Sequence, residues 1–445
     1  MKRMNKTGRI QVFELIGVLL LLFGTNSLLC AADGRLEQQV DSAWKAIWSN
    51  FYSTETCLFY DFLESLEPGK TLDHLPSAEE VRDLTPNPCG YGTAMEDCAI
   101  SGGVILTALI DRYENEKRLG AAPASLERIK TEAREVFRGL ELLATVSNSP
   151  GFVARGVSPK APGLCYINSS RDQVTHLAIA VWEYWRSSLS DEDARRRAAD
   201  VLYAVADRMI RNVIPENNYD FLCSDGSHCR IGICKMANVE DHEAARLTAI
   251  YAMAWDVARR SCESEKEEKY WKYWRTIARE TVEQSAHIIG NKDLQNRMPP
   301  YAYLQMQESL NVLYTLESDS ELREELSKTM AFISRRIATR QAGALKTLQS
   351  RDLTVVAPEW REVGGLNGDY RATWYAPREC GEIALTIAAD NANPSFNEEN
   401  ARLLQASLET PDFSKITSCG IFHLVGAYEK ARRLGFFVDD SKVEK

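Results

Sequence analysis

Apolar residues recur along the chain at the three- and four-residue spacing of an α-helix, and the alternation typical of β-strands is almost absent. From Leu36 onward, for example, Val40, Trp44, Ile47 and Phe51 fall on one helical face. The spacing predicts helices at Leu36–Phe51, Ala94–Asn115, Ser125–Ser147, Arg171–Ser187, Ser190–Val213, Val239–Ser261, Glu265–Ile289, Tyr301–Leu316, Ser320–Ala338, Trp374–Ala389, Asn397–Leu408 and Cys419–Leu434. The sequence therefore predicts an all-α protein.

The predicted helices alternate in character. The first and every second one after it carry a charged face, as at residues 265–269, whereas those between them are apolar almost all round, as at residues 178–182. A helix that is apolar on every side must be surrounded by protein, whereas an amphipathic helix can face water. The alternation predicts six inner and six outer helices paired as hairpins, with Tyr301–Leu316 the least regular inner member. An open α-solenoid is the alternative, but the chain has neither capping repeats nor a fixed repeat length.

Each predicted inner helix begins with polar or aromatic residues and becomes apolar afterwards. The starts are residues 95–98, 169–176, 240–243, 301–305, 374–379 and 418–423. In a ring of parallel helices these starts converge at one mouth, where free N–H groups and positive dipole ends suit anions and polar ligands. An acidic residue in one first turn is usually only a cap. The repetition at helix after helix favours a binding site.

Two loops leading into this mouth combine glycine, aromatic residues and arginine. One is the segment 149–157, which leads to Tyr166, and the other is the segment 364–371 before Trp374. Arginine offers a planar donor fork that matches carboxylates and sulfates. Aromatic faces together with carboxylates and arginines are typical of carbohydrate sites, and the arginines favour an acidic sugar.

The amino terminus has the pattern of an export signal. Four basic residues stand in the first ten positions, an apolar run covers Leu15–Phe23, and small residues end at Ala32. We expect a signal peptide at residues 1–32 and a secreted or periplasmic protein without a stable membrane span. Lipoprotein anchoring at Cys30 is the alternative, although Leu29 stands where a small residue is expected. Removal of residues 1–32 changes the net charge from −10 to −13, because 49 basic and 62 acidic residues remain.

Composition and missing motifs exclude several classes of function. The chain has no basic stripe interleaved with aromatic residues, which excludes nucleic acid as a partner. It also lacks a Gly-x-Ser-x-Gly elbow, a Walker loop and a dinucleotide fingerprint. Cys223, Cys229 and Cys234 lack the paired spacing of a zinc site, so disulfides are expected in that loop. The sequence calls for no metal and no cofactor.

Six helical hairpins, with Ser169-Ser170-Arg171-Asp172-Gln173 opening the fourth helix after the loop 151–156, resemble the six-hairpin glycosidase superfamily of (α/α)6 toroids. The likeness covers nearly the whole mature chain in architecture and is specific in motif over Pro150–Trp185. Members of that superfamily include unsaturated glucuronyl hydrolases, other glycosidases, polysaccharide lyases and sugar epimerases. The resemblance implies one (α/α)6 barrel domain over residues 33–440, a disordered tail at 441–445, and action on sugars.

We therefore expect a glycoside hydrolase that acts on an acidic oligo- or polysaccharide. Such an enzyme needs one protonated and one ionised carboxyl group. Asp172 is the predicted acid, Asp97 or Asp241 its partner, and His176 a further catalytic candidate. The predicted substrate-binding residues are Arg155, Arg171, Tyr166, Gln173, Glu240, His242, Tyr301, Trp374 and Arg378.

Two other hypotheses remain open from the sequence. A polysaccharide lyase would remove the proton beside a uronate carboxylate, and His176, Tyr166, Asn168 and Arg171 could supply its base and neutralising groups. A secreted helical binding protein would use the same residues as core and caps. The absorbance of the double bond in lyase products distinguishes lyase from hydrolase.

Overall fold

The computed structural model describes residues 34–229, 233–355 and 369–438. This part of the chain is mostly helical, which confirms the all-α prediction. Residues 34–46 are helical and continue into the π-helix η1 (Ile47–Phe51). The further α-helices are α2 (Ala78–Arg82), α3 (Cys98–Arg118), α4 (Pro123–Thr145), α5 (Arg171–Arg186), α6 (Glu192–Asn212), α7 (Ala245–Arg260), α8 (Ser264–Ala286), α9 (Lys292–Arg297), α10 (Pro300–Leu316), α11 (Ser320–Ala338), α12 (Gln341–Gln349), α13 (Asp369–Ala388), α14 (Glu398–Glu409) and α15 (Gly420–Arg433).

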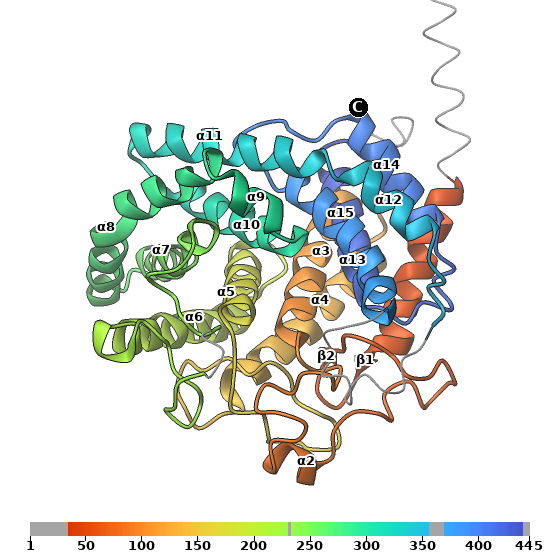
Figure 1. The fold of residues 1–445 in the computed structure, drawn as a ribbon, viewed down its shortest axis with the longest axis horizontal. Coiled ribbons are helices and arrows are strands. Elements are labelled where there is room, and N and C mark those ends of the chain that lie inside the picture. The colour runs from red at the N-terminus through yellow and green to blue at the C-terminus, as the bar shows by residue number, and fades with distance from the viewer. Residues whose placement is uncertain (1–33, 230–232, 356–368, 439–445) are drawn as a thin grey trace, which may run out of the picture.

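The six mostly buried long helices contact one another in a cyclic order. Helix α3 packs against α5, α5 against α7, α7 against α10, α10 against α13, α13 against α15, and α15 against α3. These helices lie in the middle of the view in Figure 1. Each corresponds to a helix that the sequence predicts to be apolar on all sides, including α10, the least regular of them.

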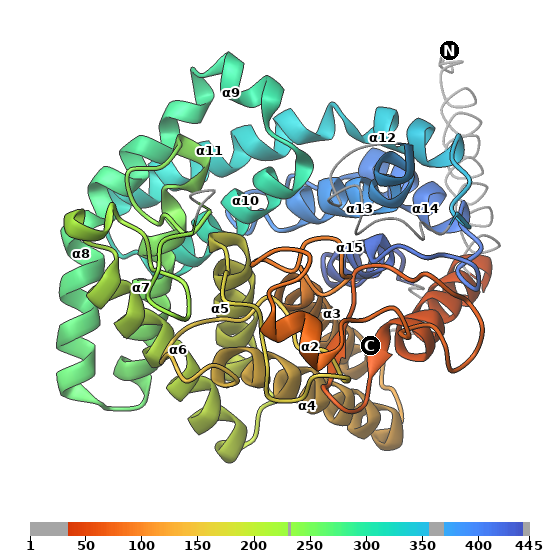
Figure 2. The same cartoon turned by 60° about the horizontal axis from the view of Figure 1, so that its bottom comes forward.

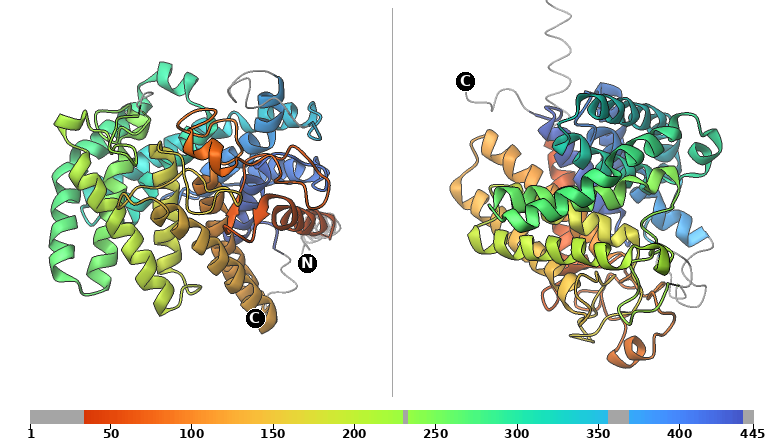
Figure 3. Two further views of the ribbon diagram at one scale, coloured as in Figure 1. Left: turned by 90° about the horizontal axis from the view of Figure 1, so that it is seen from below. Right: turned by 90° about the vertical axis from the view of Figure 1, so that its left-hand side faces the viewer.

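The more amphipathic helices lie outside this group. Helix α4 contacts α3, α6 contacts α5 and α7, and α8 contacts α7. Helix α11 contacts α10 and α13, whereas α14 contacts α13 and α15. Figure 3 shows α6, α7 and α8 side by side at one flank of the molecule. Each of these outer helices therefore contacts the inner helix that precedes it in the chain, and α6, α11 and α14 also contact the inner helix that follows.

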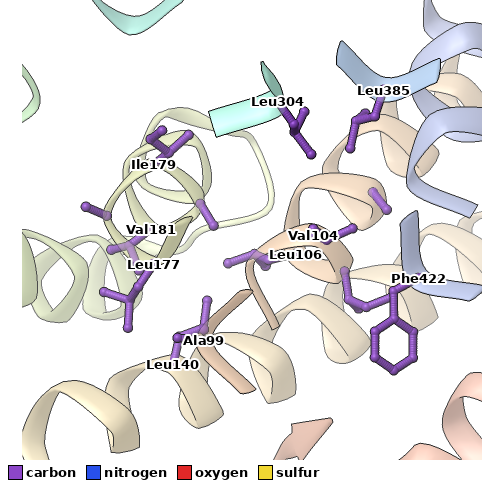
Figure 4. Close-up of a cluster of buried hydrophobic side chains, with 14 of the residues drawn as sticks. Ala99, Val104, Leu106, Leu140, Leu177, Ile179, Val181, Leu304, Leu385 and Phe422 are labelled. Atoms are coloured by element: carbon purple, nitrogen blue, oxygen red, sulfur yellow. The ribbon is translucent and has the colours of Figure 1, made fainter. Parts of the chain in front are cut away.

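One hydrophobic core joins the helices. It extends from Leu36 to Ala431 through the described residues. Figure 4 shows its centre, where Leu106 of α3, Leu177 of α5 and Phe422 of α15 lie among apolar side chains from neighbouring helices. A continuous core of this kind fixes the inner helices relative to one another, and therefore fixes the groups at their ends.

Close helix packing also sets the position of the polar side chains on α13. A Cβ added at Gly381 would lie 2.4 Å from the carbonyl carbon of His423, so the backbones of α13 and α15 touch at this point. No larger residue fits there without a shift of one helix. Arg378 and Glu382, on the same helix as Gly381, are thereby held close to α15.

Non-helical segments gather at one side of the molecule. The segment 52–97 contains the antiparallel hairpin of β1 (Tyr52–Ser53) and β2 (Leu58–Phe59), with Tyr52 opposite Phe59. It lies with the loops before α5 and α7 at the bottom of Figure 1, and these loops come forward in Figure 2. Helices α3, α5 and α7 begin at this side.

The structure also differs from the predicted elements at several places. Helix α7 begins at Ala245 and not at Val239, because Asp241–Glu243 form the separate 3-10 turn η3. The short helices α2, α9 and α12 were not expected, since each is too short for a periodic pattern. The predicted signal peptide, the tail 441–445 and most of the loop 364–371 lie outside the described residues. Within the described part of the chain, every helix is too short or too polar to cross a membrane.

Candidate functional site

Charged and polar side chains meet where the inner helices begin. We call this group the polar cluster. It consists of Asp61, Glu96, Asp97, Arg155, Arg171, Asp172, Gln173, Glu243, Arg246, Arg378 and Glu382. These residues come from α5, η3, α7, α13 and the two loops before α3 and α5, so the fold brings together groups that are far apart in the sequence.

Asp97, just before α3, is the centre of one half of the polar cluster. Its Oδ1 atom accepts hydrogen bonds from Gln173 Nε2 at 2.8 Å and from Arg155 Nη2 at 3.3 Å. Its Oδ2 atom accepts one from Arg378 Nη1 at 2.9 Å. The starts of α3 and α5, the middle of α13 and one loop therefore converge on a single carboxylate, and two buried guanidinium groups balance its charge.

Two further carboxyl groups lie directly beside Asp97. Asp61 Oδ2 accepts a hydrogen bond from the Asp97 backbone N–H at 2.8 Å, and its Oδ1 accepts one from Ser101 at 3.3 Å. Glu96 Oε1 accepts one from the Gly92 backbone N–H at 3.2 Å. Burial raises the pKa of Asp61 strongly, and the charges of Asp97 and Glu96 raise it further. Burial, followed by the charge of Asp97, raises the pKa of Glu96 to about 7.

The other half of the polar cluster is formed by two arginine–carboxylate pairs at α5 and α7. Arg246 Nη1 bonds Asp172, and Arg171 Nε donates to Glu243 Oε1 at 2.5 Å. Burial raises the pKa of Asp172, but the charges of Arg246 and Arg171 outweigh it, so the pKa lies below the usual value. Asp172 is ionised at neutral pH, and its side chain is 31% exposed.

Below this surface lies a more deeply buried layer. Arg378 Nε donates to Glu382 Oε1 at 2.7 Å, and Tyr375 donates to Glu382 Oε2 at 2.9 Å. Burial raises the pKa of Glu382 to about 7 despite its arginine partner. His176 Nδ1 lies 3.3 Å from Glu308 Oε2, and burial lowers the pKa of His176 to about 4. His176 is therefore neutral at pH 7.

These shifts divide the carboxyl groups into two kinds. Glu96, Glu382 and Asp61 have raised pKa values, so they hold protons near neutral pH, whereas Asp172 stays ionised. Neighbouring carboxyl groups whose environments push their pKa values apart are typical of acid–base sites. The lowered pKa of Asp172 suits a base or a charged stabiliser, and it disfavours the general-acid role predicted from the sequence.

Several of the predicted residues do meet in the polar cluster. They are Asp97, Arg155, Arg171, Asp172, Gln173 and Arg378. His176 and Tyr301 lie next to it, since the charges of Asp172 and Arg378 act on both side chains. His242 is also adjacent, with Nε2 at 3.8 Å from Glu243 Oε1, and its pKa is lowered to about 4 by burial and by Arg246.

Asp241, Glu240 and Tyr166 have partners outside the polar cluster, whereas Trp374 contacts Asp61 and Arg378 of the cluster. Asp241 accepts from Asn291 Nδ2 at 3.2 Å, and Glu240 pairs with Arg297 on an exposed surface. Tyr166 is buried and donates to the Thr85 carbonyl oxygen at 2.5 Å. Trp374 Nε1 donates to the Asp61 carbonyl oxygen at 2.9 Å. These contacts place Asp241 and Glu240 at the side of α8 and α9, and they give Tyr166 and Trp374 packing and anchoring roles.

Five members of the polar cluster and one neighbour were not among the predicted site residues: Asp61, Glu96, Glu243, Arg246, Glu382 and the neighbouring Tyr91. Arg246 and Glu382 carried a usable signal, because each is a charged residue inside a helix that is otherwise apolar. Tyr91, whose ring lies 4.6 Å from the Arg155 guanidinium carbon, and Asp61 stand in an irregular loop without such a signal. Glu96 was noted as part of a helix start, but only its burial distinguishes it from an ordinary cap.

Two cavities formed by described residues lie away from the polar cluster. One of about 470 Å³ lies at the carboxyl ends of the inner helices and is lined by residues that include Asp111, Glu183, Lys430 and Arg433. Another of about 640 Å³ lies between the ends of α5, α6 and α7. Among the described residues, no three His, Cys, Asp or Glu side chains are arranged to hold a metal ion.

No protein-family model matches the chain, and no curated protein matches it significantly in sequence.

Proposed function

We propose that the cyclic order of inner helices is that of an (α/α)6 toroid and that the protein is an exported glycoside hydrolase of the six-hairpin type. The support for the toroid is the closed series of contacts from α3 through α5, α7, α10 and α13 to α15 and back to α3. The parallel inner helices of such a toroid place their amino ends around one mouth. The polar cluster lies at these ends.

The proposed activity rests on the contrast between Glu96, whose pKa burial raises to about 7, and Asp172, whose pKa its arginine neighbours lower. Gln173, next to Asp172, donates its Nε2 hydrogen bonds to the Glu96 carbonyl oxygen at 3.0 Å and to Asp97, so the starts of α3 and α5 are tied together. In this scheme Glu96 donates its proton to the leaving glycosidic oxygen. Asp172 accepts a proton from the water that attacks the anomeric carbon.

Arginines beside these carboxyl groups support an acidic substrate. Arg171 is 19% exposed and faces the same surface as Asp172. Arg155 is buried, and its Nε and Nη1 atoms have no hydrogen-bond partner within the described structure. Buried donors left without a partner are costly, and a carboxylate or sulfate oxygen of a bound glycan would satisfy them. We therefore assign a uronate-containing or sulfated glycan as the substrate.

The contacts of two residues favour a hydrolase over a lyase. Tyr166 and Asn168 belong to the group that a lyase mechanism would need, but the Tyr166 hydroxyl donates to a backbone carbonyl. The Asn168 amide contacts the thiols of Cys89 and Cys229. Both side chains already have partners outside the polar cluster. A β-elimination would be left with His176 and Arg171 alone.

The test is an assay of the purified protein on a panel of uronate and sulfated glycans with two detectors. We expect new reducing ends without ultraviolet absorbance from a new double bond. Asp172→Asn should lower turnover by at least ~100-fold while the protein remains folded. Products that absorb in the ultraviolet would instead establish a lyase, and unchanged turnover in the variant would remove Asp172 from the mechanism.

A further inference from the structure

Four cysteines from two distant loops meet beside the start of α5. Cys89 lies in the loop before α3, whereas Cys223, Cys229 and Cys234 lie in the loop between α6 and α7. All four side chains are at most 5% exposed and are thiols in the structure. The sequence predicted disulfides within the second loop only, and Cys89 is the unexpected fourth member.

Asn168 lies at the centre of this group. Its Nδ2 atom is 3.3 Å from Cys89 Sγ and 3.5 Å from Cys229 Sγ, so one amide spans both thiols. The Cys223 thiol donates to Asn168 Oδ1 at 2.9 Å. The Cys234 thiol donates to the Ser169 carbonyl oxygen at 3.3 Å. Four sulfur atoms are thus gathered around two consecutive residues.

The thiols also contact one another, and the contacts indicate the partners. Contact with Cys229 is the main cause that raises the pKa of Cys89, followed by burial. Contact with Cys223 is the main cause that raises the pKa of Cys234. Cys229 also contacts Cys223 and Cys234, which leaves a second pairing geometrically open. Cys229 is the thiol that contacts Cys89.

Backbone hydrogen bonds already hold the surrounding segments in register. The Asn168 N–H donates to the Pro88 carbonyl oxygen at 3.1 Å, and the Ser224 N–H donates to the Ile167 carbonyl oxygen at 2.9 Å. The Phe221 N–H donates to the Cys234 carbonyl oxygen at 3.1 Å. Sulfur atoms held this way need side-chain rotation and small shifts to reach bonding distance, which is about 2.05 Å.

We propose that Cys89 and Cys229 form one disulfide bond and that Cys223 and Cys234 form a second. Each bond forms by thiol–disulfide exchange with a disulfide reagent, such as oxidised glutathione. One thiolate attacks the reagent disulfide and releases one reagent thiol, and the second thiolate then displaces the other. The protein loses two hydrogens per bond, and the reagent is reduced to two thiols.

The Cys89–Cys229 bond would tie the loop before α3 to the loop before α7 across the start of α5, and the Cys223–Cys234 bond would close the second loop on itself. The Arg171 N–H, at the first residue of α5, donates to the Ile233 carbonyl oxygen at 2.9 Å, next to Cys234. The crosslinks would therefore fix the backbone from which Arg171 and Asp172 extend. This inference is independent of the proposed sugar chemistry.

Peptide mapping of the non-reduced protein tests the proposal. The full chain is equilibrated in a glutathione redox buffer, its remaining thiols are alkylated under denaturing conditions, and it is digested without reductant. Trypsin cuts after Arg230, and an Asp-specific protease cuts before Asp225, so the three cysteines of the second loop fall on separate peptides. We expect one crosslink from Cys89 to Cys229, one from Cys223 to Cys234, and a mass loss of about 4 Da.

The remaining cysteines of the described chain serve as internal controls. We expect alkylation at Cys57, Cys98, Cys165, Cys262, Cys380 and Cys419. Reductant should lower the melting temperature by roughly 5–10 °C per bond broken. Cys89→Ser should lower it similarly, whereas Cys262→Ser at an exposed position should not change it. Full alkylation of all four thiols, any other pairing, or a stoichiometric zinc ion retained with four alkylatable thiols would overturn the proposal.

Discussion

The two ends of the inner helices carry charge in different ways. At their amino ends, the polar cluster places six carboxyl groups, Asp61, Glu96, Asp97, Asp172, Glu243 and Glu382, among the four guanidinium groups of Arg155, Arg171, Arg246 and Arg378. At the carboxyl ends, each buried acid is surrounded by cations. Asp111 has Arg433 at 2.8 Å and Lys430 at 3.7 Å, and Asp256 has Arg260 at 2.7 Å.

Burial raises the pKa of carboxyl groups at both ends, including Glu183 and Glu429 at the carboxyl ends. A carboxyl group that is buried without its own cation is more stable when protonated, because burial disfavours the charged form. Burial raises the pKa of Glu96 to about 7, and it raises that of Glu382 to about 7 despite the Arg378 partner, whereas the pKa of Asp172, between two arginines, is lowered. At the carboxyl ends Asp111 and Asp256 are paired with cations, whereas at the amino ends carboxyl groups with raised and lowered pKa values lie close together.

The largest expected effect is on the free energy of unfolding, and it is seen when one arginine from each end of the inner helices is replaced. Arg378→Met leaves Asp97 and Glu382 with one cation fewer in a buried place, so the free energy of unfolding should fall by about 3–5 kcal/mol. Arg433→Met removes a half-exposed partner of Asp111 and should change the free energy by less than ~1 kcal/mol. Urea denaturation of both variants measures this contrast. Equal losses in the two would show that the ends are electrostatically alike.

A second pair of arginines compares the two ends in substrate binding. Arg171→Met should raise KM for a uronate glycan roughly 10- to 100-fold, because a charge-assisted hydrogen bond to the substrate carboxylate is lost. Arg186→Met, which removes a cation near Asp256, should change KM less than about twofold. Arg171→Lys serves as the charge-conserving control. A KM unaffected by Arg171→Met would place the anion elsewhere.

The sequence predicts the inner helices well because burial on all sides leaves an unmistakable apolar pattern. The start of α5 is correct to the residue, since the Ser170 side chain caps the helix as its identity suggests. Short helices such as α9 and α12 are not predicted, because they contain too few residues to show a periodic apolar pattern. Pro377 lies inside α13 and did not stop the helix from being predicted through it.

The site was predictable where residues stand at helix starts and less so elsewhere. Asp97 and Asp172 stand at helix starts as expected, whereas Arg378 reaches Asp97 from the middle of α13, which begins at Asp369 and not at Trp374. Which of these carboxyl groups is protonated depends on burial and on arginines from other helices, and no local pattern contains that information. Asp241 was a reasonable candidate by position, but the 3-10 turn around it directs it toward Asn291.

A smaller effect, on the pH dependence of stability, tests whether carboxyl groups with raised pKa values extend beyond the polar cluster. Glu308 lies between the two ends, and burial followed by the charge of Glu183 raises its pKa to about 8. The folded state thus keeps a proton that the unfolded state releases above pH 4.5, so stability should fall as pH rises toward 8. Buried histidines such as His176 have lowered pKa values and act oppositely, but only below pH 6.5.

The measurement is the free energy of unfolding between pH 6.5 and 8 for the wild type and for Glu308→Gln. The wild type should lose on the order of 1 kcal/mol per pH unit relative to the variant. If the two plots of unfolding free energy against pH are parallel, Glu308 is ionised over the whole range, and its pKa is not raised in the way that those of the polar cluster are.

The most direct test of the account is the pH dependence of kcat/KM for the wild type and for Glu96→Gln. The wild type should lose activity on a uronate glycan as pH rises through about 7, because Glu96 gives up the proton that the leaving group needs. Glu96→Gln should be at least ~100-fold slower on that glycan. It should keep most of its activity on an aryl glycoside whose leaving group needs no proton, without the decline above pH 7. A decline near pH 7 that persists in Glu96→Gln would contradict the assignment of the acid.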